Sequence, residues 1–279
     1  MSFFGLSESV FRFGSFALIF AIMALAETLF PKRERRFSRT LRWTTNFGIL
    51  LTDYVAVFIF TFIGMVTAVG AAAYAEHMQW GLLNNIDLPI WLEWLIAIVV
   101  LDFVIWAQHV ATHKIPILWR LHRVHHSDED IDASTAIRFH PIEILFSVLV
   151  KSAAVLVLGP AAGAVVVFEA FVNGSALFNH ANVKLPQWAD GILRSLFVTP
   201  DMHRVHHSSI NRETDSNYGF GLSIWDRIFR TYIAQPEKGH DGMTIGLDEW
   251  QGDGPSHYPW AISLPFRNPP HTSDEDRAQ

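Results

Sequence analysis

The stretch LHRVHHS at residues 121–127 returns as MHRVHHS at residues 202–208, with six of the seven positions identical. If each copy is helical, its three histidines stand at positions i, i+3 and i+4 and share one face of the helix within a single turn. Such a face is typical of metal ligands, whereas a solvated basic turn would not need the same triplet twice. The repeat therefore predicts a metal site that draws on two distant segments.

The composition is that of a membrane protein. Of the 279 residues, 50% are hydrophobic and only 17% are charged. The formal net charge is −6, so no basic surface suggests a nucleic acid as partner. The absence of cysteine excludes disulfides, thiolate-ligated iron–sulfur or haem centres and Cys-type zinc sites. Any metal ion must therefore be bound through nitrogen or oxygen.

Apolar stretches predict an all-α fold, a polytopic membrane helix bundle. Residues 11–30 are long enough to span a bilayer of ~30 Å. A cleaved signal peptide is disfavoured because the apolar run continues beyond the cleavage-like ALA at residues 24–26. Residues 54–75 and 91–107 predict a second and a third span. Residues 1–90, with two spans and an outer loop, form the predicted N-terminal transmembrane region.

Basic residues between the first two spans set the predicted orientation. Six of them stand close together: Lys32, Arg33, Arg35, Arg36, Arg39 and Arg42. The positive-inside rule places this linker in the cytoplasm, and the loop from Glu76 to Ile90, without Lys or Arg, outside. The third span then delivers His109 and His113 to the cytoplasmic side.

The apolar stretch that follows Pro141 predicts a hairpin. As one helix, the ~39 residues up to His180 would be ~58 Å long, nearly twice the hydrocarbon thickness. Gly159 and Pro160 near its midpoint predict a break, because proline lacks a donor and clashes with the preceding turn. The second leg then returns to the side that the first one left. We therefore expect both copies of the repeat in one histidine-rich cytoplasmic cap.

Nine histidines have the spacing or the surroundings of metal ligands. They are His109, His113, His122, His125, His126, His180, His203, His206 and His207. Nine imidazoles are too many for one ion, since zinc takes about four ligands and an octahedral ion about six. Two ions fit, and Fe, Zn, Cu and Ni all accept nitrogen ligands.

Three further residues are candidates for metal contact or for orienting a ligand. Asp102 and Asn173 each precede a predicted ligand by two helical turns and share a helix face with it. At that separation we expect orientation of an imidazole, not ligation. His140 has two possible roles, contact with the metal or capping of the helix that Pro141 begins.

The order of these motifs resembles that of the fatty acid hydroxylase and sterol desaturase superfamily. The resemblance rests on HxxxH at 109–113, the two HxxHH motifs, RxHPxE at 138–143, FNHAN at 178–182, NYG at 217–219 and WDR at 225–227. It implies a membrane-bound, non-haem di-iron oxygenase with these histidines as ligands. Two Fe ions, which Zn can replace, would use O2 to hydroxylate an unactivated C–H bond of a fatty acyl, sterol or related lipid.

The resemblance also implies the domains and the partners. Residues 91–235 are the expected catalytic domain, and residues 236–279, rich in Gly, Pro and Asp, an irregular tail. The partners are the lipid substrate, the membrane and an external electron donor of ferredoxin or cytochrome type. The lack of an organelle signal favours a bacterial inner membrane. Two alternatives stay open: a lipid desaturase with the same site, and a metal-handling protein whose histidines line a path through the bilayer.

Overall fold

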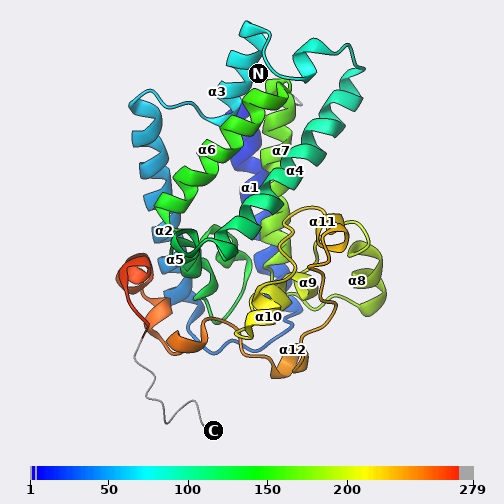
Figure 1. Cartoon of the computed structure of the whole chain (residues 1–279). Helices are drawn as coiled ribbons and strands as arrows, with labels where there is room; N and C mark the ends of the chain where they lie inside the picture. The colour runs from blue at the N-terminus through cyan, green and yellow to red at the C-terminus, as the bar shows by residue number, and fades with distance from the viewer. Residues whose placement is uncertain (1, 4, 270–279) are drawn as a thin grey trace.

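The computed structural model describes residues 2–3 and 5–269, and its architecture is a bundle of long helices with a cap at one end (Figure 1). Within these residues, five helices are long and apolar enough to cross a membrane: α1 (Glu8–Leu29), α2 (Arg39–Phe62), α4 (Ile90–Lys114), α6 (Pro141–Leu158) and α7 (Ala162–Asn179). A short antiparallel pair, β1 (Ser2–Phe3) and β2 (Leu6–Ser7), precedes α1. The predicted all-α membrane helix bundle is confirmed.

The remaining elements are short. They are α3 (Ala68–Met78), α5 (Pro116–His126), α8 (Gln187–Leu193), α9 (Pro200–His206), α10 (Asn211–Thr214), α11 (Ile224–Ile228), α12 (Gly239–Gly242) and α13 (Tyr258–Ser263), with 3-10 turns η1 (Leu83–Asn85), η2 (Ala133–Ile137), η3 (Asp248–Trp250), η4 (Gly254–Ser256) and η5 (Leu264–Phe266). Helices α5, α9, α10 and α12 gather at one end of the bundle, opposite α3 and the N-terminus (Figure 1). Residues 115–140 and 180–269 together are called the cap below.

The predicted hairpin is present. Helix α6 ends at Leu158, Gly159 adopts the left-handed conformation with φ 66°, and α7 begins at Ala162. Gly81, with φ 89°, packs against this turn so closely that a Cβ there would lie 2.4 Å from the Gly159 nitrogen. The turn therefore requires glycine at both positions, and it returns the chain to the cap.

The second span differs from the predicted residues 54–75. Helix α2 begins at Arg39, where the Ser38 hydroxyl accepts a hydrogen bond from Leu41 N at 3.4 Å, and ends at Phe62. Gly64, with φ 89°, then breaks the chain before α3. The apolar composition continues across this break, and a polar first half of α2 packs on the cap. Hydropathy alone therefore could not locate either end.

The basic linker between α1 and α2 is bound to the cap. Lys32 forms an ion pair with Asp201 at 3.0 Å. Arg42 is fully buried between Asp128 and Asp132, with nitrogen–oxygen distances of 2.7 Å to each. The linker and the histidines therefore lie at the same end of the bundle.

The segment after residue 236 is more ordered than an irregular tail. Its short helices and turns pack Trp250, Ala261 and Leu264 into a cluster with Ile49 of α2 and Val124 of α5. The part of the expected tail at residues 270–279 lies outside the described residues. The predicted boundaries between the three domains stay predictions.

Candidate metal centre

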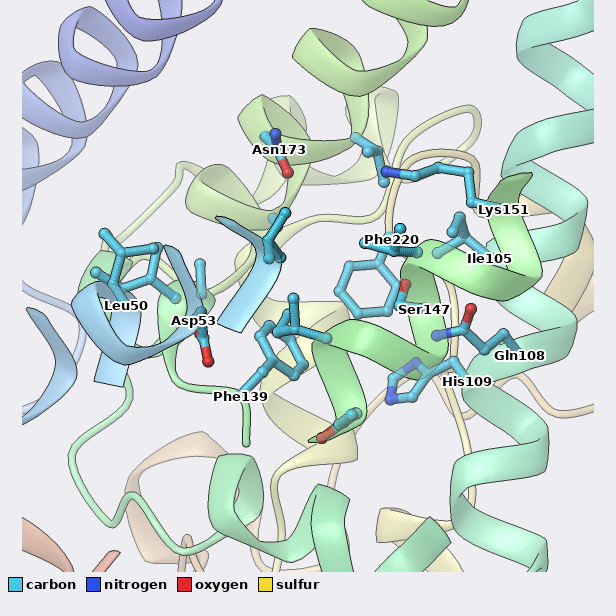
Figure 2. Close-up of a pocket in the computed structure, with 18 of the residues that line it drawn as sticks. Leu50, Asp53, Ile105, Gln108, His109, Phe139, Ser147, Lys151, Asn173 and Phe220 are labelled. Atoms are coloured by element: carbon cyan, nitrogen blue, oxygen red, sulfur yellow. The ribbon is translucent and has the colours of Figure 1, made fainter. Parts of the chain in front are cut away.

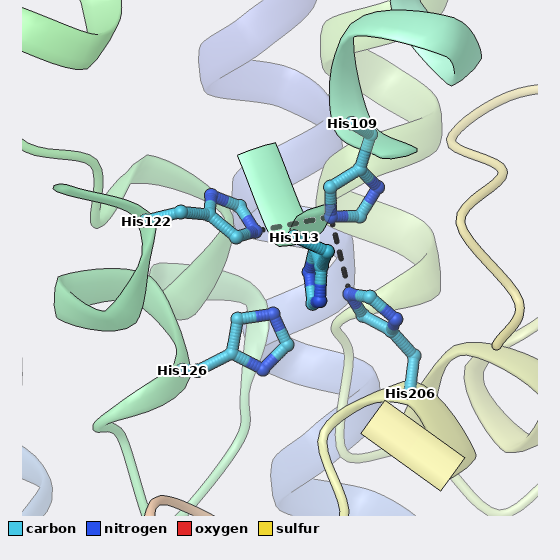
Figure 3. A group of neighbouring side chains, drawn as sticks. All are labelled: His109, His113, His122, His126 and His206. Atoms are coloured by element: carbon cyan, nitrogen blue, oxygen red, sulfur yellow. Dashed lines mark hydrogen bonds between the residues drawn. The ribbon is translucent and has the colours of Figure 1, made fainter. Parts of the chain in front are cut away.

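The structure brings the nine predicted histidines together in two adjoining groups. The first group is His109, His113, His122, His126 and His206, and the second is His125, His180, His203 and His207. Within each group one nitrogen of every ring lies within 4.8 Å of the others. Figure 3 shows the five rings of the first group, which come from α4, α5 and α9 and turn toward a common centre. A group of four or five imidazoles suits one ion.

The two copies of the repeated motif exchange their middle histidines. In the copy on α5 the two outer histidines belong to the first group, whereas His125 belongs to the second. In the copy at the end of α9 the outer two belong to the second group, and His206 joins the first. The groups therefore interlock, and the rings of His126 and His207 stack between them at a centroid distance of 4.6 Å.

Hydrogen bonds fix which nitrogen of four rings carries the proton. The Nδ1 partners are Glu143 Oε1 at 2.6 Å for His122, Tyr218 O at 2.7 Å for His109, Ser216 O at 2.7 Å for His206 and Ala176 O at 2.7 Å for His180. Carbonyl and carboxylate oxygens only accept, so each Nδ1 must donate its hydrogen. The Nε2 atom of a neutral ring is then an unprotonated lone pair, as a metal ligand requires.

The distances between these Nε2 atoms fit a bound cation. Close pairs are His109 with His122 at 3.0 Å, His109 with His206 at 3.1 Å, His125 with His180 at 3.0 Å and His180 with His203 at 3.1 Å. In the pairs that His109 forms, both Nε2 atoms lack a hydrogen, so their approach cannot be a hydrogen bond. Nitrogens bound at ~2.1 Å to one ion, at right angles, would lie ~3.0 Å apart. The donor set therefore fits a divalent transition-metal ion.

Burial keeps the imidazoles of the cap neutral. It lowers the pKa of His122 to about 3. Burial and the neighbouring rings also hold the pKa values of His125, His126, His203, His206 and His207 well below 6.5. Neutral rings at physiological pH are available to a metal ion without loss of a proton.

Asp226 supports the first group through the loop that contains Tyr218. Its carboxylate accepts hydrogen bonds from Tyr218 N at 2.9 Å, Gly219 N at 2.8 Å and Trp106 Nε1 at 3.0 Å. Neither Asp226 nor Glu143 was predicted to be a site residue, although they belong to the WDR and RxHPxE motifs. Their roles could have been inferred from one feature of the sequence, a carboxylate at a fixed spacing from a predicted ligand.

The three candidates for supporting roles lie outside both groups. His140 caps α6, where its Nδ1 accepts from Ile142 N at 3.3 Å. Asp102 accepts from Trp225 Nε1 at 2.7 Å and Leu222 N at 3.2 Å, so its link to a histidine is indirect. Asn173 lines the cavity described next. Their influence on metal binding stays a prediction.

A cavity of about 330 Å³ adjoins the first group (Figure 2). It lies among α2, α4, α6 and α7, and His109 and His122 form part of its wall. Ile105, Phe139 and Val148 are among its apolar side chains. Tyr54 also lines it, and 60% of Tyr54 is exposed, so one wall of the cavity includes a residue of the bundle surface. The second group contributes no residue to this wall.

Comparison with known proteins agrees with this geometry. Residues 94–231 match the family model described as fatty acid hydroxylase. Ornithine lipid hydroxylase OlsE of Rhizobium tropici is 28% identical over 227 residues, which cover 77% of this chain and 65% of that protein. Human alkylglycerol monooxygenase is 32% identical over 163 residues, covering 57% of this chain and 34% of that protein. Alkylglycerol monooxygenase of Xenopus tropicalis is 32% identical over 180 residues, which cover 62% of this chain and 38% of that protein.

The matched region is less than two thirds of the length of each of these relatives. No solved structure matches the chain. The family model covers the two HxxHH motifs, the RxHPxE segment and the loop held by Asp226. Residues 94–231 of the chain form a fatty acid hydroxylase domain.

Proposed function

We propose that this integral membrane protein is an O2-dependent hydroxylase of a lipid, with two iron ions held by the nine histidines. The observation that carries the proposal is the contact between the cavity and the first group. The cavity reaches the lipid-facing side of the bundle at Tyr54 and ends on His109 and His122. An acyl or alkyl chain that enters between α2 and α6 would meet these histidines.

The nine histidines fit two ions of a nitrogen-preferring metal, one in each group. Iron ions bound there would supply the redox chemistry needed to activate O2 for attack on a C–H bond. Zinc would occupy the same ligands without redox activity. The electrons would come from a separate donor of ferredoxin or cytochrome type.

The side chains around the groups orient the ligands and exclude water. Glu143 fixes the ring of His122, and the Tyr218 carbonyl fixes the ring of His109. Phe139 stacks on His125 with a centroid distance of 4.4 Å, and Phe220 covers His109 at 4.8 Å. Water is thereby kept from the substrate carbon beside the first group.

The relatives support the lipid substrate and the type of reaction. Their names describe a hydroxylase of an ornithine lipid and monooxygenases of alkylglycerols. The metal-handling alternative predicts ligands spread along a path through the bilayer. All nine histidines instead lie together at the cap end of the bundle. We therefore favour the oxygenase.

Oxygen-18 gas tests the reaction. Iron-loaded protein in lipid vesicles, supplied with a reductase and a ferredoxin, is incubated with a lipid extract, and the products are analysed by mass spectrometry. We expect a hydroxylated lipid whose new oxygen comes from the labelled gas. Product oxygen derived from water would contradict the proposal. An unsaturated product without added oxygen would assign the desaturase reaction.

We further propose that the cap lies in the cytoplasm, in a bacterial inner membrane. The basic linker supports this orientation, because it binds the cap and would obey the positive-inside rule. The chain lacks cysteine, so single cysteines report cleanly. A Lys238→Cys variant, exposed on the cap, should label with an impermeant maleimide only after the cytoplasmic side is opened. An Asp87→Cys variant at the opposite end should label in intact cells, and the reverse pattern would invert the topology.

A further inference from the structure

Three acceptor oxygens in the wall of the cavity lack a donor. Asp53 Oδ1, Gln108 Oε1 and Glu143 Oε2 are buried, and no described residue offers them a hydrogen bond. Asp53 is 5% exposed and Glu143 is 4% exposed, and all three residues line the cavity. A buried acceptor without a partner costs ~1–3 kcal/mol, and more when it is charged. These three oxygens are therefore available to a ligand that donates hydrogen bonds.

Two of the three acceptors adjoin the histidines of the first group, and the third comes from α2, across the cavity from them (Figure 2). Gln108 immediately precedes His109 on α4. Glu143 uses its other oxygen for His122, at 2.6 Å. Asp53 approaches from α2, and Figure 2 shows it at the level of Phe139. A donor group held by these oxygens would lie close to the first group of histidines.

The protein itself does not neutralise these carboxylates with a cation. Among the described residues no Lys or Arg forms an ion pair with Asp53 or Glu143. The cationic side chain in the cavity wall, Lys151, pairs with Glu169 instead. Lys151 stands eight residues after Glu143, which places it ~12 Å further along α6. The two ends of the cavity therefore differ: the carboxyl groups at one end have no cationic partner among the described residues, whereas the charges at the other end are paired.

We propose that Asp53, Gln108 and Glu143 bind a hydrogen-bond-donating head group, an ammonium or a hydroxyl, of the lipid substrate. The apolar chain of that lipid would extend past Val57 and Val148 toward the bundle surface between α2 and α6. This inference rests on the proposed function, because it takes the cavity as the lipid site. It selects amphipathic lipids whose reacting carbon lies near the head group over lipids oxidised far along the chain.

The test is equilibrium binding to the metal-free full-length protein in detergent. Three probes with the same chain, hexadecylamine, hexadecanol and hexadecanoate, compete with a fluorescent long-chain lipid. We expect the amine and the alcohol to bind at least about tenfold more tightly than the carboxylate, which as an anion only accepts hydrogen bonds. The better of the two donors identifies the head group as ammonium or hydroxyl.

Variants assign the preference to the acceptors. Asp53→Leu, and independently Gln108→Met, should reduce the preference to less than about threefold, because each removes an unpaired acceptor at nearly constant volume. Val57→Ala, one turn further along α2, is the matched control and should weaken all three probes equally. Equal binding of the three probes by the unmodified protein would overturn the inference. An unchanged preference in both variants would also overturn the inference, because the acceptors would then bind water and not the probe.

The outcome of this binding test does not depend on the outcome of the oxygen-18 test. Binding is measured without metal, so failure to incorporate oxygen from O2 would not alter the order of the probes. Conversely, an active hydroxylase that binds the carboxylate best would retain its function and lose only the head-group inference.

Discussion

The two copies of the repeated motif have nearly the same sequence but different surroundings. The copy on α5 ends an 11-residue helix and contributes His122 to the cavity wall. The copy on α9 belongs to a seven-residue helix and contributes no residue to that wall. A carboxylate orients His122, whereas the Ser216 carbonyl orients His206. The repeat thus fixes the spacing of the histidines, and the rest of the chain decides which group adjoins the cavity.

The arginines of the two copies show the same contrast. Arg123 donates to the carbonyls of Leu264 and Arg267, both at 2.6 Å, and so joins the first copy to the C-terminal segment. Arg204 pairs with Asp201 at 2.5 Å, and Asp201 also binds Lys32 of the basic linker. Each copy is therefore fastened to a different distant part of the chain.

Replacement of a middle histidine should have the largest effect. His125→Ala removes a ligand from the second group and His206→Ala one from the first, so each variant should lose activity and about one bound ion. The double variant should cost little more activity than either single one, because groups that act together are non-additive. Elemental analysis and turnover assays measure both effects. His77→Ala, exposed on α3 at the opposite end of the bundle, is the control, and full activity of either single variant would refute its role as a ligand.

Loss of the carboxylate that orients His122 should have an intermediate effect, confined to the first group. Glu143→Ala should lower metal affinity or activity ~10–100-fold, as is usual when the partner of a ligating histidine is removed. A competitive metal titration should show one weakened ion and one unchanged ion. Ser147→Ala, one turn further along α6 in the same cavity, should change neither affinity. An equal loss of affinity for both ions would contradict the assignment of Glu143 to the first group alone.

The smallest effect concerns the loop that orients His109 and His206. Asp226→Asn replaces an acceptor of Tyr218 N and Gly219 N by an amide that cannot satisfy both, so the cap should lose ~1–3 kcal/mol of stability. Denaturant unfolding followed by tryptophan fluorescence measures the loss. Asp253→Asn, whose side chain is 83% exposed, should change stability by less than ~0.5 kcal/mol. Similar losses in the two variants would show that the loop does not depend on Asp226.

Spacing and hydropathy were enough to predict the bundle, the hairpin at Gly159 and the nine histidines that the structure brings together, whose role as metal ligands stays a prediction. They could not predict how the histidines divide into groups, because the division depends on how α5 and α9 approach each other. The hydrogen bonds to the carbonyls of Ser216 and Tyr218 could not be predicted from the sequence either, since every residue has a carbonyl. Asp53 was overlooked, although an acidic residue inside an apolar helix is itself a sign of function.

The exchange of the middle histidines has a consequence for biogenesis. Neither group can be completed by one continuous segment, since each draws on both copies of the motif. A nascent chain that stops before residue 203 offers the second group only His125 and His180. Its last two ligands arrive only after both legs of the hairpin have been synthesised and inserted. Both histidine groups are therefore complete only once the chain extends beyond residue 207.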